Sequence, residues 1–153
     1  MLRAIAAVVV GYFVMAALAV ASAGVSWGIL GAEGAFAEGS TVASTPWSVL
    51  SVVMGLIAAV LAGFIAAQIG RHPTNMPVKI LAGFVLLFGL ALAVVTSGAT
   101  PTPIPEGKTM ADMTFFEAGQ VASNPAWYLW LIPVVGAVGT LIGGRLRKVE
   151  PAA

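Results

Sequence analysis

The chain has 153 residues, of which 59% are hydrophobic and only 8% are charged, and its net charge is +1. A soluble domain carries about 25% charged residues, because its surface faces water. The composition therefore excludes an ordinary soluble domain, and without any run of Lys and Arg it gives no indication of a nucleic-acid partner. Cysteine is absent, which excludes disulfides, thiolate metal sites and iron–sulfur clusters. We expect one domain, residues 1–153, surrounded by the lipid bilayer.

The first predicted transmembrane helix covers about residues 4–30, none of which is charged. A helix of this length reaches about 40 Å, more than the roughly 30 Å hydrocarbon core, so it should tilt or protrude. The same stretch also fits a secretory signal peptide, because Arg3 precedes an apolar run that leads to an A-x-A cleavage site at Ala23. The apolar run continues past Ala23 to Leu30, which favours retention over cleavage of residues 1–23.

The second predicted helix covers about residues 47–70 and follows a polar outer loop, residues 31–46, that contains three glycines and two glutamates. Small residues recur along this helix at every fourth position: Ser51, Gly55, Ala59, Gly63 and Ala67. This spacing places them on one face, where another helix can approach closely. We expect these residues to pack helices together within the chain, with a contact to another protein as the alternative.

The third predicted helix covers about residues 78–96, after a cytoplasmic turn at residues 71–77 that contains Pro73 and Pro77. A second outer loop, residues 97–125, follows it and is the longest polar segment of the chain.

A short helix is predicted inside this second loop. Thr109 and Asp112 have the spacing of a capping box, which indicates a helix start, and the helix would cover residues 109–122. Four apolar residues form its expected stripe: Met110, Met113, Phe116 and Val121. Such a helix would lie along the membrane surface. The alternative is an irregular lid over the bundle.

The fourth predicted helix covers about residues 126–144, and Pro133 should kink it because proline removes one backbone hydrogen bond. Its small residues at four-residue spacing predict two further packing faces and include Gly136, Gly139 and Gly143. The predicted fold class is therefore an all-α integral membrane protein, a bundle of four transmembrane helices.

The distribution of charge predicts the orientation. Six of the 7 basic residues fall on one side of the predicted bundle: Arg3, Arg71, Lys79, Arg145, Arg147 and Lys148. The positive-inside rule makes this side cytoplasmic, together with both termini. The four tryptophans fall at the outer helix ends, as an interfacial belt requires: Trp27, Trp47, Trp127 and Trp130. We expect these ten residues to contact lipid headgroups, in the plasma (inner) membrane of a bacterium.

Two short sequence matches indicate a tandem repeat of two helical hairpins. The segment beginning at Ala17 (ALAV) recurs at Ala91, and the segment beginning at Val42 (VAS-x-P) recurs at Val121. Each match falls at the same place in its hairpin. A duplication of the hairpin is therefore plausible.

No catalytic, cofactor or metal site is predicted. Away from their ends the four helices contain no Asp, Glu, Lys, Arg or His, the groups that buried catalysis or ion coupling would need. His72, the single histidine, lies in the cytoplasmic turn, and the outer acidic residues lack the close spacing of a calcium loop. The polar residues within the helices should mostly bond to their own helix: Tyr12, Ser22, Ser26, Ser48, Ser51, Gln68 and Thr140.

The expected function is non-catalytic: a structural or accessory subunit that packs against other membrane proteins. The first alternative is a small channel or facilitator formed by several copies of the chain, and the second is a membrane enzyme of unknown type.

Overall fold

The computed structural model describes residues 2–71, 74–98, 103–104, 106–109 and 112–147. Within this part of the chain all regular structure is helical: α1 (Leu2–Ala35), α2 (Thr45–Gly70), α3 (Met76–Ser97), α4 (Phe115–Val121) and α5 (Ala126–Arg145). Four of these helices, α1, α2, α3 and α5, are long and apolar enough to cross a membrane. The prediction of an all-helical fold with four such helices is confirmed.

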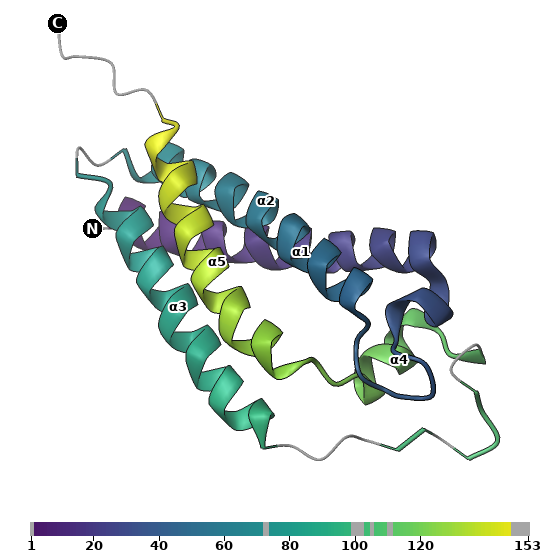
Figure 1. The fold of residues 1–153 in the computed structure, drawn as a ribbon. Helices are drawn as coiled ribbons and strands as arrows, with labels where there is room; N and C mark the ends of the chain where they lie inside the picture. The colour runs from purple at the N-terminus through teal and green to yellow at the C-terminus, as the bar shows by residue number, and fades with distance from the viewer. Residues whose placement is uncertain (1, 72–73, 99–102, 105, 110–111, 148–153) are drawn as a thin grey trace, which may run out of the picture.

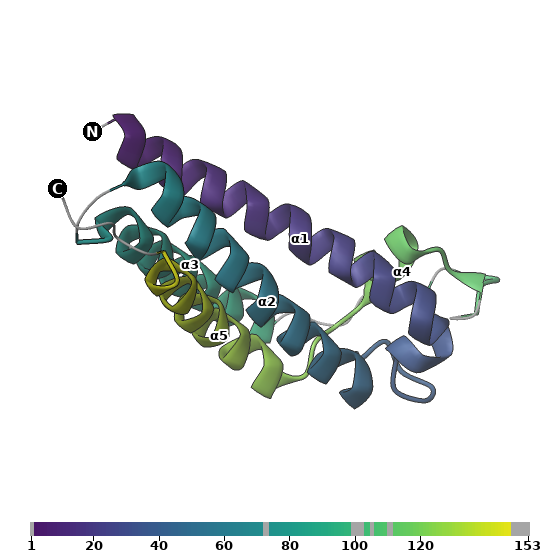
Figure 2. The ribbon, with the colours of Figure 1, turned by 90° about the horizontal axis from the view of Figure 1, so that it is seen from above.

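Helices α2 and α5 lie side by side at the centre of the molecule, with α1 packed on α2 and α3 packed on α5 (Figures 1 and 2). The start of α1, the α2–α3 turn and the end of α5 lie at one end, which we call the basic end (Figure 1). The α1–α2 connection and α4 lie at the other, which we call the capped end.

Helices α1 and α3 contact each other less than the central pairs do. Their close approach is at Gly11, where an added Cβ would lie 2.7 Å from Leu81 Cδ2 and 3.1 Å from Ala66 Cβ. Gly11 and Leu81 are both buried. Helices α1, α2 and α3 therefore meet at this depth.

The first outer loop is shorter than residues 31–46. Gly31 has a left-handed backbone (φ 63°), which redirects α1 without ending it, and one further turn continues to Ala35. Ser44 then ties both ends of the loop together: its hydroxyl donates to the Gly34 carbonyl oxygen (2.5 Å) and accepts from the Trp47 N–H (3.2 Å). Ser44 is thus the N-cap of α2.

The turn between α2 and α3 is also shorter than predicted, because α3 begins at Met76. Arg71 and Asn75 both have left-handed backbones, with φ of 43° and 50°, and reverse the chain direction. Asparagine tolerates this conformation better than most residues. Its side chain is also held in place, since Asn75 Nδ2 donates to the Gly144 carbonyl oxygen at 3.1 Å. His72 and Pro73 lie outside the described residues.

The predicted start of the short helix at Thr109 is wrong. The Asp112 carboxylate does accept from the Thr109 backbone N–H and hydroxyl, and Asp112 lies in a 3₁₀ turn, but the α-helix does not begin there. Instead Met113 turns into the core, Thr114 is extended (φ −71°, ψ 160°), and α4 begins at Phe115. Thr114 and Glu117 form the actual capping box, with each side chain accepting from the other residue's backbone N–H.

The expected apolar stripe of this helix does not form as a single face. Met113 and Val121 are buried, together with Ala118, against the end of α1. Phe116 is 76% exposed and points away, and Met110 lies outside the described residues. Helix α4 is therefore a lid on the capped end. This is closer to the predicted alternative, an irregular lid over the bundle, than to a free helix on the membrane surface.

The two VAS-x-P segments pair with each other at the capped end. Val42 and Ser123 form a parallel bridge, in which the Ala43 N–H donates to the Ser123 carbonyl oxygen (2.8 Å) and the Ser123 N–H donates to the Thr41 carbonyl oxygen (3.0 Å). The equivalent loops of the two hairpins thus lie together. The tandem repeat itself stays a prediction.

Candidate functional site

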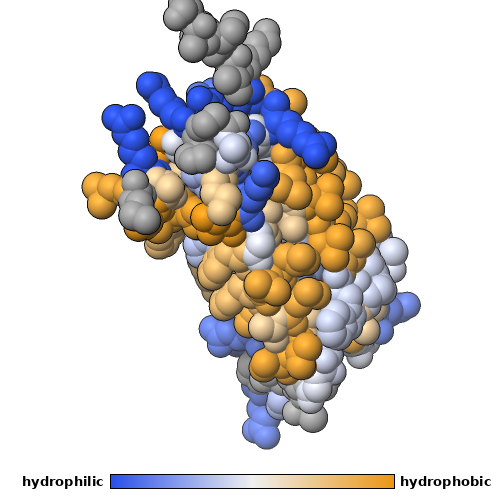
Figure 3. Space-filling model, turned by 90° about the vertical axis from the view of Figure 1, so that its left-hand side faces the viewer, coloured by the Kyte–Doolittle hydropathy of each residue, from blue (hydrophilic) through white to orange (hydrophobic). Residues whose placement is uncertain are grey.

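Apolar side chains cover the middle of the molecule, and hydrophilic ones gather towards its ends (Figure 3). Most of the strongly exposed large apolar residues lie on α1 and α3 and include Phe13, Ile29, Leu87 and Val95. Such a belt is far more apolar than water tolerates on a monomeric soluble protein.

The candidate sites in this belt are the faces where small residues leave the backbone accessible. The first is the α2–α5 seam, which consists of Ala59, Gly63, Gly139, Thr140 and Gly143. A Cβ added to Gly63 would lie 2.0 Å from the Thr140 carbonyl oxygen, and one added to Gly143 would lie 1.9 Å from the Val60 carbonyl oxygen. A Cβ added to Gly139 would lie 2.8 Å from Ala59 Cβ. The two backbones touch, and only glycine fits at these points.

The other residues expected to pack helices lie at the margins of this seam or beside it. Gly136 faces Val85 of α3, whose Cγ1 would be 2.9 Å from an added Cβ. Ala67 is buried against the start of α3. Ser51 and Gly55 line cavities near the bundle centre, and a Cβ at Gly55 would meet only Ile132 Cδ1, at 3.3 Å.

A second small-residue face lies on α1 and was not predicted from the sequence. Ala17, Ala21, Gly24 and Gly28 are all exposed, and at helical spacing they fall on one face, which we call the α1 ridge. No atom lies within 4 Å of a Cβ added to Gly24 or Gly28. The repeated four-residue spacing from 17 to 21 and from 24 to 28 is the signal that could have revealed this ridge.

The basic end carries the predicted headgroup-contacting cations. Arg3, Arg71, Lys79 and Arg145 are exposed there. Arg147 is only partly exposed, because its Nη1 donates to the Ala67 carbonyl oxygen at 3.0 Å, near the end of α2. This bond ties the end of α5 to α2. Lys148 lies outside the described residues.

The four tryptophans divide into two pairs. Trp27 and Trp47 contact each other edge-to-face (ring centroids 6.3 Å apart), and Trp27 also contacts Phe36 and Phe115. This aromatic cluster joins α1, α2 and the α4 lid. Trp127 and Trp130, at the start of α5, are each 45% exposed.

The one ion pair among the described residues lies on the lid. Lys108 Nζ donates to Glu117 at 2.5 Å, and both side chains are about two-fifths exposed. The Lys108 ammonium and the Thr114 N–H and hydroxyl lower the pKa of Glu117 to about 2. The Thr109 hydroxyl and N–H lower the pKa of Asp112 in the same way. These bonds stabilise local turns and hold no reactive group.

The polar residues within the long helices mostly bond to their own backbone. Thr140 Oγ1 donates to the Gly136 carbonyl oxygen (2.8 Å), and the Ser22 hydroxyl donates to the Leu18 carbonyl oxygen (2.6 Å). We expected the Tyr12 hydroxyl to have a hydrogen-bond partner, but it has none among the described residues. The Tyr12 ring packs edge-to-face on Phe84. No group of three His, Cys, Asp or Glu able to hold a metal occurs in that part of the chain.

Comparison with protein-family models, with curated protein sequences and with solved structures finds no match for this chain. Its function has to be argued from its own residues.

Proposed function

We propose that the protein is a non-catalytic integral membrane protein, an accessory subunit that packs against another membrane protein through the α1 ridge. The apolar belt over α1, α2, α3 and α5 supports membrane insertion, because each of these helices has the length and hydropathy of a transmembrane segment. Charges occur at the two ends of the bundle and leave the belt between them free of Asp, Glu, Lys, Arg and His.

The orientation follows from the basic end. Arg3, Arg71, Lys79 and Arg145 are exposed at the same end as the start of α1 and the end of α5. By the positive-inside rule, this end and both termini are cytoplasmic and the α4 lid is outside. In a bacterium the membrane would be the plasma (inner) membrane.

The α1 ridge is the observation that carries the accessory role. Helices in lipid gain nothing from burying apolar surface, so they associate where small residues let the backbones approach closely. The small residues of α2 are already in contact with α5. A Cβ added to Gly24 or Gly28 would meet no atom of the described residues within 4 Å, and the ridge faces away from the bundle, so a helix that packs on it would belong to a second polypeptide.

A second copy of the chain is the alternative occupant of the ridge. Two α1 helices could cross at Gly24 and Gly28, since small-residue faces of this spacing pair with themselves in membrane dimers. This arrangement would give the homo-oligomeric channel or facilitator a structural basis.

The native mass of the complete protein, extracted from its own membrane in mild detergent, tests the proposal. A complex of defined stoichiometry with one other integral membrane protein would support the accessory role. A complex of identical chains would favour the alternative, and a lone monomer would refute both.

A further inference from the structure

Two adjoining cavities lie between the long helices. The larger, about 290 Å³, is bounded by α1, α2, α3 and α5 and is half-open. The smaller, about 210 Å³, lies nearer to the capped end between α1, α2 and α5. Ala19, Gly55 and Ile132 line both of them, so the two cavities adjoin at these residues, and we call the two together the interhelical space.

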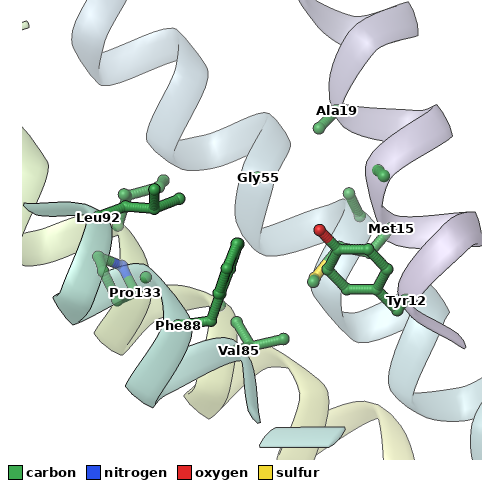
Figure 4. A pocket seen from close by; sticks show the side chains of 13 residues that line it. Tyr12, Met15, Ala19, Gly55, Val85, Phe88, Leu92 and Pro133 are labelled. Carbon is green, nitrogen blue, oxygen red and sulfur yellow. The ribbon is translucent and has the colours of Figure 1, made fainter. Parts of the chain in front are cut away.

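The larger cavity is apolar. Figure 4 shows Phe88, Val85 and Leu92 of α3 on one side and Tyr12 and Met15 of α1 on the other. Helices α2 and α5 also contribute to the lining, with small residues that include Gly55 and Gly136. The Tyr12 hydroxyl is the one polar group that a lining side chain provides. An engineered cavity of about 150 Å³ with apolar walls stays dry and binds benzene, so this larger one is suited to hydrocarbon rather than water.

The smaller cavity carries hydroxyl groups. Ser22, Ser26, Ser51 and Tyr128 line it, with Trp47 at its margin. Ser51 belongs to α2 and Tyr128 to α5, so two helices supply these hydroxyl groups besides α1. One turn away on α2, the Ser48 hydroxyl is buried and has no hydrogen-bond partner among the described residues. This region therefore offers several neutral donors and acceptors, at the end of the space nearest the capped end.

We propose that this space binds one uncharged lipid with a hydroxyl or carbonyl head and a single hydrocarbon chain. The head lies among Ser22, Ser26, Ser51 and Tyr128, and the chain lies between Tyr12 and Phe88. Ser26 and Tyr12 are about 20 Å apart along α1, at a rise of about 1.5 Å per residue, which suits an extended molecule parallel to the helices.

The lining chemistry selects against other occupants. No cation or anion lines either cavity, so a phosphate or carboxylate head would be buried without a partner. Water would lack the two to four polar partners that it needs in the apolar part. The inference requires that lipid surrounds the chain, as proposed above, but it is independent of the accessory role.

Photolabelling of the full chain in phosphatidylcholine vesicles tests this site. The probe is a monoacylglycerol with a diazirine in its acyl chain, and the readout is the set of labelled peptides. We expect labels on the α1 and α3 segments around Tyr12 and Phe88, displaced by excess unlabelled monoolein. A lysophosphatidic acid with the same labelled chain should label these segments less. Labelling spread over the exposed apolar surface, or not displaced by monoolein, would overturn the proposal.

Two matched substitutions locate the site. Ala19→Phe places a ring in the shared wall and should abolish displaceable labelling, whereas Ala91→Phe, at an exposed α3 position outside both cavities, should leave it unchanged. Ser51→Ala should weaken competition by monoolein between about twofold and tenfold, as the loss of one hydrogen bond predicts. Equal displaceable labelling of the Ala19→Phe and Ala91→Phe proteins would contradict the site. Displacement of the label from the wild-type protein by monoolein tests the site without any variant.

Discussion

The α2–α5 seam and the α1 ridge have similar sequence patterns and opposite surroundings. A methyl group added to Gly63 would meet the Thr140 carbonyl oxygen at 2.0 Å, whereas one added to Gly24 would meet nothing within 4 Å. The difference lies in the facing helix: α5 offers Gly139 and Gly143 to α2, and none of the helices described in the structure faces the ridge. Small-residue spacing therefore identifies a surface that suits a helix, and the fold decides whether that helix is in the same chain.

Gly63→Ala should give the largest effect, because the new methyl group would collide with the α5 backbone, which cannot yield as a flexible side chain can. We expect a loss of about 3 kcal/mol or more in the free energy of unfolding. Denaturant titration in detergent, followed by tryptophan fluorescence, measures it. Gly55→Ala, on the same helix, is the matched control and should be close to neutral, since it meets only the tip of Ile132. Equal losses at Gly55 and Gly63 would contradict the seam.

Arg147→Ala should give a smaller loss of about 1.5–3 kcal/mol, the range for a hydrogen bond that involves a charged group. The substitution removes the bond from Arg147 Nη1 and leaves the Ala67 carbonyl oxygen with the Arg71 N–H as its one remaining donor among the described residues. Arg145→Ala, two residues earlier at an exposed position, is the control and should change stability little. The same unfolding titration distinguishes them, and equal effects would show that charge at this end matters more than the bond.

Gly24→Leu combined with Gly28→Leu should leave the stability of the isolated chain within about 0.5 kcal/mol, because a Cβ added at either position has open space around it. The unfolding midpoint of the purified monomer measures this. A large loss would show that the ridge is needed inside the fold, and the contrast with Gly63 would then disappear.

The smallest effect concerns the lid. The folded pKa of Glu117, about 2, lies below the ordinary value of 4.5, so its bonds contribute stability above pH 4.5 that is lost as the pH falls through about 2. The Thr114 amide shift, followed by NMR, should titrate with a midpoint near 2. Lys108→Ala should raise this midpoint towards 4.5, and a wild-type midpoint already at 4.5 would refute the ion pair.

The positions of the long helices could be predicted because uninterrupted apolar runs of this length have few alternatives. The start of α4 could not be predicted from the sequence. A threonine followed three residues later by an acidic residue, the pattern of a capping box, occurs twice, at Thr109–Asp112 and at Thr114–Glu117. The burial of Met113 decides between them, and burial depends on the end of α1.

The candidate sites were predictable only in part. The small residues of α2 and α5 could be found by spacing, but their mutual contact depends on which helices become neighbours. The α1 ridge has a similar but shorter and less regular pattern than the series on α2. The cavities result from imperfect packing around Ala19 and Gly55, which no local pattern encodes.

The claim that the α1 ridge binds a second polypeptide is tested most directly by the native mass of three proteins extracted from their own membrane. These are the wild type, the Gly24→Leu and Gly28→Leu double variant, and Gly83→Leu, whose α3 glycine also faces open space. We predict that the wild type and Gly83→Leu are extracted as the same complex and that the double variant is extracted as a monomer. A double variant that keeps the complex would contradict the account.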